Sequence, residues 1–408
     1  MCVEMAYAAT VLLALTVGPI YTMWREAQLN NPALPIDSAH LATFAIVQLP
    51  ALFLLGKRVT ISMSWKSAEW YLFALIGWLV FTSATSDIGA YAVGNAAKVA
   101  LAACTGLYLA VSFTRRQQLI AITIATHMGV LISRFAIARD WPESIYESRE
   151  WSGIYVNPNL LGPVAAVACV SLIFLAISFF NNIRREWRIA FLVFVFDIAV
   201  FDVVVLLRTK AFTSILATCV ALGIVLFAYV VRRVNAVEKF VQVWPRLVVA
   251  LSGGLVVSMV VLYRFSSLVN GKLLPRSALQ ERVFAWDFSW TGFLERPWLG
   301  WGQGVAWSNQ IFRRLDLYWT VVNIGHSHSA YFDVLLSGGI LAGVLLLTYL
   351  VIALMRISKE CSSPEFDAQR IALVFFCLSA ALFEPFIVAN YFLWPILVMS
   401  LAVTKPNN

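Results

Sequence analysis

The chain has 408 residues, of which 61% are hydrophobic and 13% are charged, and its formal net charge is +8. Its mean hydropathy of +0.79 excludes an ordinary soluble domain and indicates a polytopic membrane protein. The positive charge does not indicate a nucleic-acid partner, because no basic stripe with interleaved aromatic residues occurs in a soluble segment. We attribute this charge to membrane topology and to contact with anionic membrane lipids.

Apolar stretches close to the roughly 20 residues that cross a bilayer recur along the chain. They predict an all-α fold with about twelve transmembrane helices, in a single transmembrane domain over residues 1–408. The spans are expected near residues 4–22, 39–56, 68–86, 90–113, 117–136, 158–180, 189–207, 211–231, 247–265, 331–355, 371–389 and 391–404. The first stretch lacks a basic leader and a small-residue cleavage site, so we expect a retained helix. The last stretch is short for a span.

Basic residues fall in every second predicted loop, at positions 57–58, 115–116, 184–188, 232–239 and 356–359. Because basic loops of membrane proteins stay on the cytoplasmic side, both termini are expected in the cytoplasm. The long segments 137–157 and 266–330 then lie on the outer face, where ATP and nucleotide sugars are absent.

The longest outer segment, residues 266–330, contains the stretch RSALQERVFAWDFSWTGFLERPWLGWGQG. After Arg282, residues at helical spacing predict an amphipathic helix on the membrane surface. These residues are Ala285, Trp286, Phe288, Ser289 and Phe293. Pro297 and the glycines at 300, 302 and 304 then favour turns.

Two of the four histidines lie two positions apart, in NIGHSHSAYFDVLLSGG (residues 323–339). As a metal pair they lack a third ligand nearby, so the zinc signal is weak. They are either polar residues that cap the next span or a site of proton transfer. His328 directly precedes Ser329 and the span, and an imidazole with an ordinary pKa of about 6.5 accepts a proton from a sugar hydroxyl at neutral pH. We assign His326 an accessory role.

Arg208, Thr209 and Lys210 interrupt two apolar spans. An arginine within a span costs about 2.5–3.5 kcal/mol on insertion scales, so it is normally paired, functional or snorkelled to the interface. Arg276 and Arg282 present the same choice on the outer segment. If Arg208 and Arg282 converge beside His328, they form a cationic site that suits a diphosphate, which arginine binds with two parallel hydrogen bonds.

Several common site motifs are missing from the sequence. No D-x-D pair on an outer loop offers to hold a metal–diphosphate complex, and there is no catalytic carboxylate pair, nucleophile elbow or Walker loop. The six cysteines form neither a disulfide framework nor a metal-binding spacing. Ionisable residues in or near spans leave open a transporter of lipid-linked glycans, or simple structural pairing. These residues are Lys98, His127, Arg134, Asp197, Asp202 and Glu384.

Four features together resemble the O-antigen ligase and polymerase superfamily, over roughly residues 150–345. They are HSHSAYFDVLLSGGILAG, RVFAWDFSWTGFLERPWLGWGQG, GIYVNPNLLGPVAA and the arginine between the seventh and eighth spans. In that family a histidine followed by Asn, Ser or Gln, a short way before a glycine, is catalytic, and His328, Ser329 and Gly339 match it. The family's diphosphate contacts correspond to Arg208 and Arg282.

The resemblance implies a GT-C-type fold with a long periplasmic loop that carries short helices. It also implies a multi-pass protein of the bacterial inner membrane, with an active site that faces the periplasm and needs neither metal nor cofactor. Family members transfer a glycan from undecaprenyl diphosphate. Ligases transfer it to a core sugar of lipid A, and polymerases to another lipid-linked glycan.

We expect a ligase, although Gly343 follows Gly339 by four residues where some ligases have a closer second glycine and a threonine pair. The expected reaction is one-step transfer with inversion. The two arginines neutralise the leaving diphosphate, and His328 deprotonates the acceptor hydroxyl. The aromatic residues Trp286, Trp298 and Tyr318 of the outer segment are expected to stack on sugars. The residues with accessory roles are Lys210, His326, Arg276 and Ser329.

Overall fold

The computed structural model describes residues 2–16, 36–62, 67–146, 149–155, 157–180, 182–233, 276–307, 326–359 and 364–402. Within these ranges the chain forms twelve α-helices and two short 3-10 helices, joined by irregular segments, and the one bridge of β type pairs Ile145 with Trp151. The all-α prediction is therefore confirmed for the described residues.

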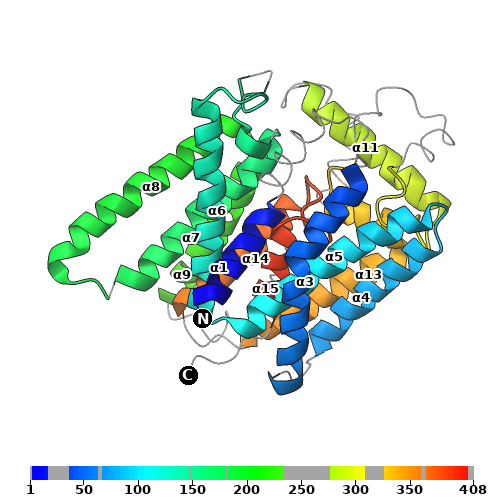
Figure 1. Cartoon of the computed structure of the whole chain (residues 1–408), viewed down its shortest axis with the longest axis horizontal. Coiled ribbons are helices and arrows are strands. Elements are labelled where there is room, and N and C mark those ends of the chain that lie inside the picture. Colours follow the sequence, from blue (N-terminus) through cyan, green and yellow to red (C-terminus); the bar gives the residue numbers. More distant parts are fainter. Residues whose placement is uncertain are drawn as a thin grey trace.

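The helices follow one another along the chain and pack as one bundle (Figure 1). Their bounds are α1 Cys2–Leu15, α3 Ile36–Ser62, α4 Ser67–Ala84, α5 Gly89–Ser112, α6 Arg115–Ala138, η1 Gly153–Tyr155, α7 Pro158–Phe180, η2 Arg185–Trp187, α8 Arg188–Thr209, α9 Phe212–Arg233, α11 Arg276–Glu295, α13 Ala330–Lys359, α14 Pro364–Ala380 and α15 Leu393–Leu401.

Five described helices are long and apolar enough to cross a membrane: α5, α6, α7, α8 together with η2, and most of α13. Four shorter apolar helices accompany them, at 2–15, 68–84, 212–227 and 368–380. The expected span at 247–265 lies outside the described residues. The expected last span is wrong in length, because α15 has only nine residues and is about 14 Å long, against a hydrocarbon core of about 30 Å.

Helix α8 lies at one edge of the bundle and packs mainly on α7 (Figure 1). Large apolar side chains stay exposed along it, including Leu192, Val193, Phe194, Phe196 and Leu207. A continuous apolar surface of this kind is costly in water, and it suits contact with lipid acyl chains.

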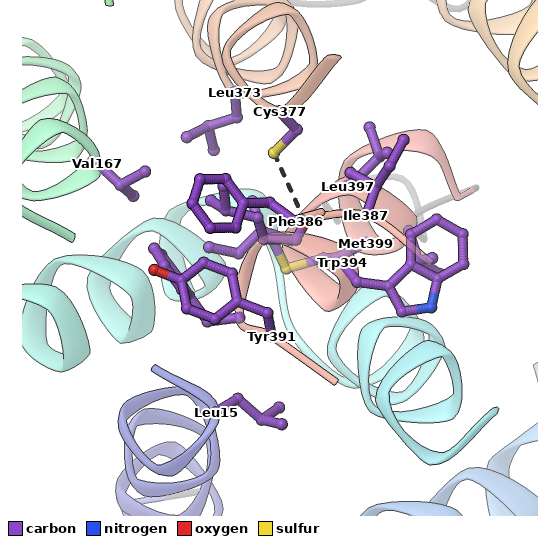
Figure 2. Packing of buried hydrophobic residues seen from close by; sticks show 14 of the residues in the cluster. Leu15, Val167, Leu373, Cys377, Phe386, Ile387, Tyr391, Trp394, Leu397 and Met399 are labelled. Atoms are coloured by element: carbon purple, nitrogen blue, oxygen red, sulfur yellow. Dashed lines mark hydrogen bonds between the residues drawn. The ribbon is translucent and has the colours of Figure 1, made fainter. Parts of the chain in front are cut away.

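The segment between α14 and α15 is irregular and yet buried. Figure 2 shows Phe386 and Tyr391 of this segment, and Trp394 at the start of α15, packed among side chains from other helices. The hydroxyl of Tyr391 donates to the carbonyl of Leu160 in α7 at 3.0 Å, and the indole of Trp394 donates to the carbonyl of Val99 in α5 at 3.3 Å. Residues 381–392 are thus fixed from several sides although they form no helix.

Helix α13 is broken at Gly339, whose φ of +66° and ψ of −164° are not helical. The amide of Ile340 donates to the carbonyl of Pro297 at 2.7 Å, and the amide of Trp301 donates to the carbonyl of Leu336 at 2.7 Å. The turns predicted after Pro297 are present, and the glycines at 300, 302 and 304 all have positive φ. This turn segment therefore packs on the break and satisfies the backbone groups that the break leaves open.

Helix α11 confirms that the stretch after Arg282 is helical, and its location on a membrane surface stays a prediction. All five residues predicted for its apolar face are buried, whereas Trp290 and Leu294 are exposed. The outer segment was expected to carry short helices, but α11 is 20 residues long. It crosses the upper edge of the molecule in Figure 1 and contacts α13.

Candidate active site

His326 and His328 lie in a short turn that leads into α13, and the first turn of that helix fixes it. The carboxylate of Asp333 accepts from the amide of Ser327 at 3.1 Å and from the indole of Trp307 at 3.0 Å. Asp333 follows the turn directly in sequence, so the helix start itself holds the histidine turn in place.

The backbone of His328 is in the left-handed region, with φ of +52°. This conformation is strained for a residue with a side chain, and such strain persists only where the surroundings enforce it. Here the amide of His328 donates to Nδ1 of His326 at 3.2 Å, and the amide of Ser329 donates to the hydroxyl of Ser327 at 3.0 Å. These bonds hold the backbone of the histidine turn in this conformation.

Glu384, in the irregular segment after α14, joins Arg282 to His328. Its Oε1 accepts from Nη2 of Arg282 at 3.0 Å, and its Oε2 lies 3.4 Å from Nδ1 of His328. The side chains are 4%, 19% and 16% exposed for Glu384, Arg282 and His328, respectively. Three elements that are far apart in the sequence thus bring an acid, a cation and an imidazole into one largely buried cluster.

The second histidine of the turn is close to the first. The ring centroids of His326 and His328 are 4.4 Å apart, and the rings are nearly perpendicular. Burial lowers the pKa of His326 to about 4; the neighbouring His328 and Arg282 act in the same direction, and Glu384 opposes them. His326 is therefore neutral at neutral pH.

The second arginine, Arg208, lies at the end of α8 as predicted, but in different surroundings. Its guanidinium carbon is 5.7 Å from the ring centroid of Trp151, and that of Arg134 is 5.3 Å from the same ring. Lys210 ends α8 in the left-handed conformation, with its ammonium 3.7 Å from Glu150. Within the described residues Arg208 contacts Trp151 through both its side chain and its carbonyl, and its convergence with Arg282 beside His328 stays a prediction.

The predicted sugar-stacking residues differ in exposure. Trp298 is 73% exposed, whereas Trp286 is 2% exposed and packs between Phe332 and Phe383. In this structure the Trp286 ring serves packing, and its predicted stacking on a sugar stays untested. Tyr318 and the side chain of Arg276 lie outside the described residues.

Several charges that suggested a transport path have partners within the described bundle. Nε2 of His127 in α6 is 2.9 Å from the carboxylate of Asp202 in α8, and Nδ1 of His127 is 2.8 Å from the carbonyl of Thr123. Arg134 lies over Trp151, and Glu384 belongs to the histidine cluster. Each of these side chains therefore has a partner within the described residues.

His326, His328 and Glu384 also form a group with the donors of a metal site. Among the described residues they are the one group of at least three such side chains whose ligand atoms gather, all within 4.8 Å of one another. The histidine pair lacks a third ligand in its own stretch of sequence. Glu384 supplies one from a distant segment.

Glu384 is the residue of this cluster whose role the sequence did not indicate. It is 102 residues from Arg282, and the sequence around Glu384 does not indicate a contact with Arg282 or with His328. The sequence does show that Glu384 is a carboxylate in an apolar stretch. Such a residue is normally functional or paired, but its position does not identify the partner.

The described chain is thus a helical protein of membrane type with a charged, buried cluster at one end of α13. Residues 198–347 match the family model described as O-antigen ligase, so the chain contains an O-antigen ligase family domain, as its motifs had suggested. This family is associated with ligase- or polymerase-type activity on lipid-linked glycans. The matched residues include Arg208, Arg282 and His328, whereas Glu384 lies beyond them. None of the curated proteins matches the chain.

Proposed function

We propose that the protein is an O-antigen ligase, a glycosyltransferase of GT-C type that moves a glycan from undecaprenyl diphosphate to a core sugar of lipid A. In this proposal it resides in the bacterial inner membrane, with both termini in the cytoplasm and with the cluster and residues 266–330 facing the periplasm. The observation that carries the proposal is the contact of Glu384 with both Arg282 and His328.

His328 acts as the general base. Its Nδ1 faces Glu384, so Nε2 is left to accept the proton of the acceptor hydroxyl. The carboxylate stabilises the imidazolium that forms, and the 3.4 Å separation shortens to a hydrogen bond when the substrates bind. The acceptor oxygen then bonds to the anomeric carbon, the bond from that carbon to the phosphate oxygen breaks, and the configuration inverts.

The arginines stabilise the leaving diphosphate. The guanidinium of Arg282 is held by Glu384, and a guanidinium binds phosphate oxygens through parallel charge-assisted hydrogen bonds. Arg208 reaches the second phosphate from the end of α8, and its exposed side chain is supported by the face of Trp151. Preorganised positive charge at the leaving group lowers the barrier without a metal ion.

The remaining groups serve the sugars and the shape of the site. Trp298 and Tyr318 stack on the glycan, because aromatic faces suit the apolar faces of sugar rings. Ser329 and His326 keep His328 in its conformation, and Lys210 and Arg276 add positive charge on the outer face.

The experiment that tests the ligase assignment offers two acceptors. Purified protein is incubated with undecaprenyl diphosphate glycan and EDTA, with lipid A core in one reaction and only further lipid-linked glycan in the other. A ligase places glycan on lipid A core. Longer lipid-linked glycan in the second reaction identifies a polymerase, the alternative that the resemblance also includes.

A matched pair of arginine variants checks the role of the cluster in the same assay. We expect Arg282→Gln to lose transfer and Arg296→Gln to retain it. Arg296 follows the same helix, but its partner is the exposed carboxylate of Asp87 at 3.2 Å. Equal activity of the two variants would remove Arg282 from the proposed site.

A further inference from the structure

We propose that His326, His328 and Glu384 form an inhibitory site for a divalent transition-metal ion of the zinc class. That the ion inhibits rests on the proposed function, because inhibition presupposes glycan transfer. The binding of the ion does not depend on that function. Two imidazoles and one carboxylate are the donor set that zinc accepts, in a tetrahedral site with one position left for water.

The geometry needs little change to hold such an ion. The three ligand atoms lie within 4.8 Å of one another, and they must draw together by roughly 1 Å to reach zinc distances of about 2.0–2.2 Å. The two histidines lie on one turn, with ring centroids 4.4 Å apart and ring planes inclined by 72°, and each contributes a nitrogen to the group of gathered ligand atoms.

The donors are available for an ion. Nδ1 of His328 is buried and makes no hydrogen bond, and Oε2 of Glu384 faces it at 3.4 Å, whereas Arg282 donates to the other oxygen, Oε1. His326 exchanges a single 3.2 Å backbone hydrogen bond for a metal bond. The second carboxylate near the turn, Asp333, already accepts from Ser327 and Trp307 and holds the turn in place.

Arg282 sets the strength of this site. Its guanidinium is 3.0 Å from Glu384 and repels a cation placed on the other oxygen. The ion therefore binds as a displaceable inhibitor. Once bound, it occupies the imidazole and carboxylate that the transfer step needs for proton acceptance, and it draws Glu384 away from Arg282.

Cobalt(II) is the probe for binding, because it takes zinc sites and absorbs visible light when bound by nitrogen and oxygen ligands. Purified full-length protein is treated with EDTA, desalted and titrated with Co²⁺. We expect one visible-absorbing Co²⁺ per chain, displaced by Zn²⁺. His326→Gln and Glu384→Gln each weaken binding by at least about 10-fold, and Arg282→Gln strengthens it.

Asp140→Asn is the matched control. Asp140 is an exposed outer-loop carboxylate with φ of +50°, a conformation that asparagine accepts well. This variant binds Co²⁺ as the unmodified protein does. Thermal melting and size-exclusion chromatography of every variant establish that each one is folded before its binding is compared.

The inhibition arm measures glycan transfer with and without Zn²⁺ and compares the ratio in each variant. We expect Zn²⁺ to inhibit, EDTA to restore transfer, and His326→Gln to need at least about 10-fold more Zn²⁺. No Co²⁺ band, or an unchanged band in His326→Gln and Glu384→Gln, overturns the site. Full transfer at saturating Zn²⁺ overturns its inhibitory role, and absence of transfer without any metal counts against the proposed function alone.

Discussion

A single carboxylate organises the candidate site at the scale of residues. Glu384 holds Arg282 on one oxygen and faces His328 with the other, so the proposed cation for the leaving group and the proposed base for the acceptor share one support. The motifs predicted the two partners because each lies in a recognisable stretch. They could not predict the link, because a contact across 102 residues leaves no local pattern in one sequence.

Glu384 is expected to act through its charge. Glu384→Gln keeps the shape of the side chain, but a hydrogen bond to a charged group is worth about 1.5–3 kcal/mol, so transfer should fall by about 10- to 100-fold. Glu384→Asp retains the charge and should recover part of the rate. Transfer rates of the two variants, measured at saturating donor, decide the point; equal losses in both would indicate a purely structural role.

His326 makes the stability of the protein depend on pH. Its pKa is lowered to about 4 in the folded protein, against about 6.5 when unfolded. The unfolded chain therefore binds a proton first, and stability is lost as the pH falls from about 6.5 to about 4, with no contribution from this group above that window.

The measurement is thermal melting in detergent with EDTA, at pH 7.5 and at pH 5. The melting temperature of His326→Gln should fall less over this interval than that of the unmodified protein. An equal fall in both proteins would show that His326 does not titrate in this window.

At the scale of elements, the break in α13 fastens this helix to the turn segment after Pro297. Residues 330–338 and 340–359 are joined at Gly339, and the carbonyls freed near the break are taken by the turn after Pro297. The sequence predicted both the turn residues and the span. It did not predict that one would pack on an interruption of the other, because the apolar pattern continues through Gly339 without a sign of the kink.

Gly339→Ala should therefore be damaging. A side chain there has φ of +66° and meets the carbonyl of Trp298, and a strained position of this kind costs about 1–3 kcal/mol. We expect a lower melting temperature and reduced transfer. Gly343→Ala is the control, because the new methyl meets only the end of the Leu335 side chain. Similar behaviour of the two variants would mean that the break is not needed.

At the scale of the whole molecule, the apolar pattern predicted an all-helical membrane protein, and the described residues contain five long candidate spans. The pattern overestimated the last span because it measures apolarity and not burial. Residues 381–401 are apolar since they fill the centre of the bundle, as the packing of Tyr391 and Trp394 in Figure 2 shows.

The predicted orientation puts Trp298 and Glu186 on opposite sides of the membrane. With the native cysteines replaced by serine, Trp298→Cys should react with a membrane-impermeant thiol reagent in spheroplasts. Glu186→Cys should react only after the membrane is opened. Both native side chains are exposed, so access is set by the membrane. The reverse labelling pattern would invert the topology and place the cluster in the cytoplasm.

The most direct test of the central claim is the rate of glycan transfer from undecaprenyl diphosphate to lipid A core by the purified protein and by His328→Ala. General-base catalysis typically contributes about 10²- to 10⁴-fold, so the variant should bind the donor but lose transfer by that factor. Lipid A core that gains glycan at an undiminished rate in folded His328→Ala would contradict the account.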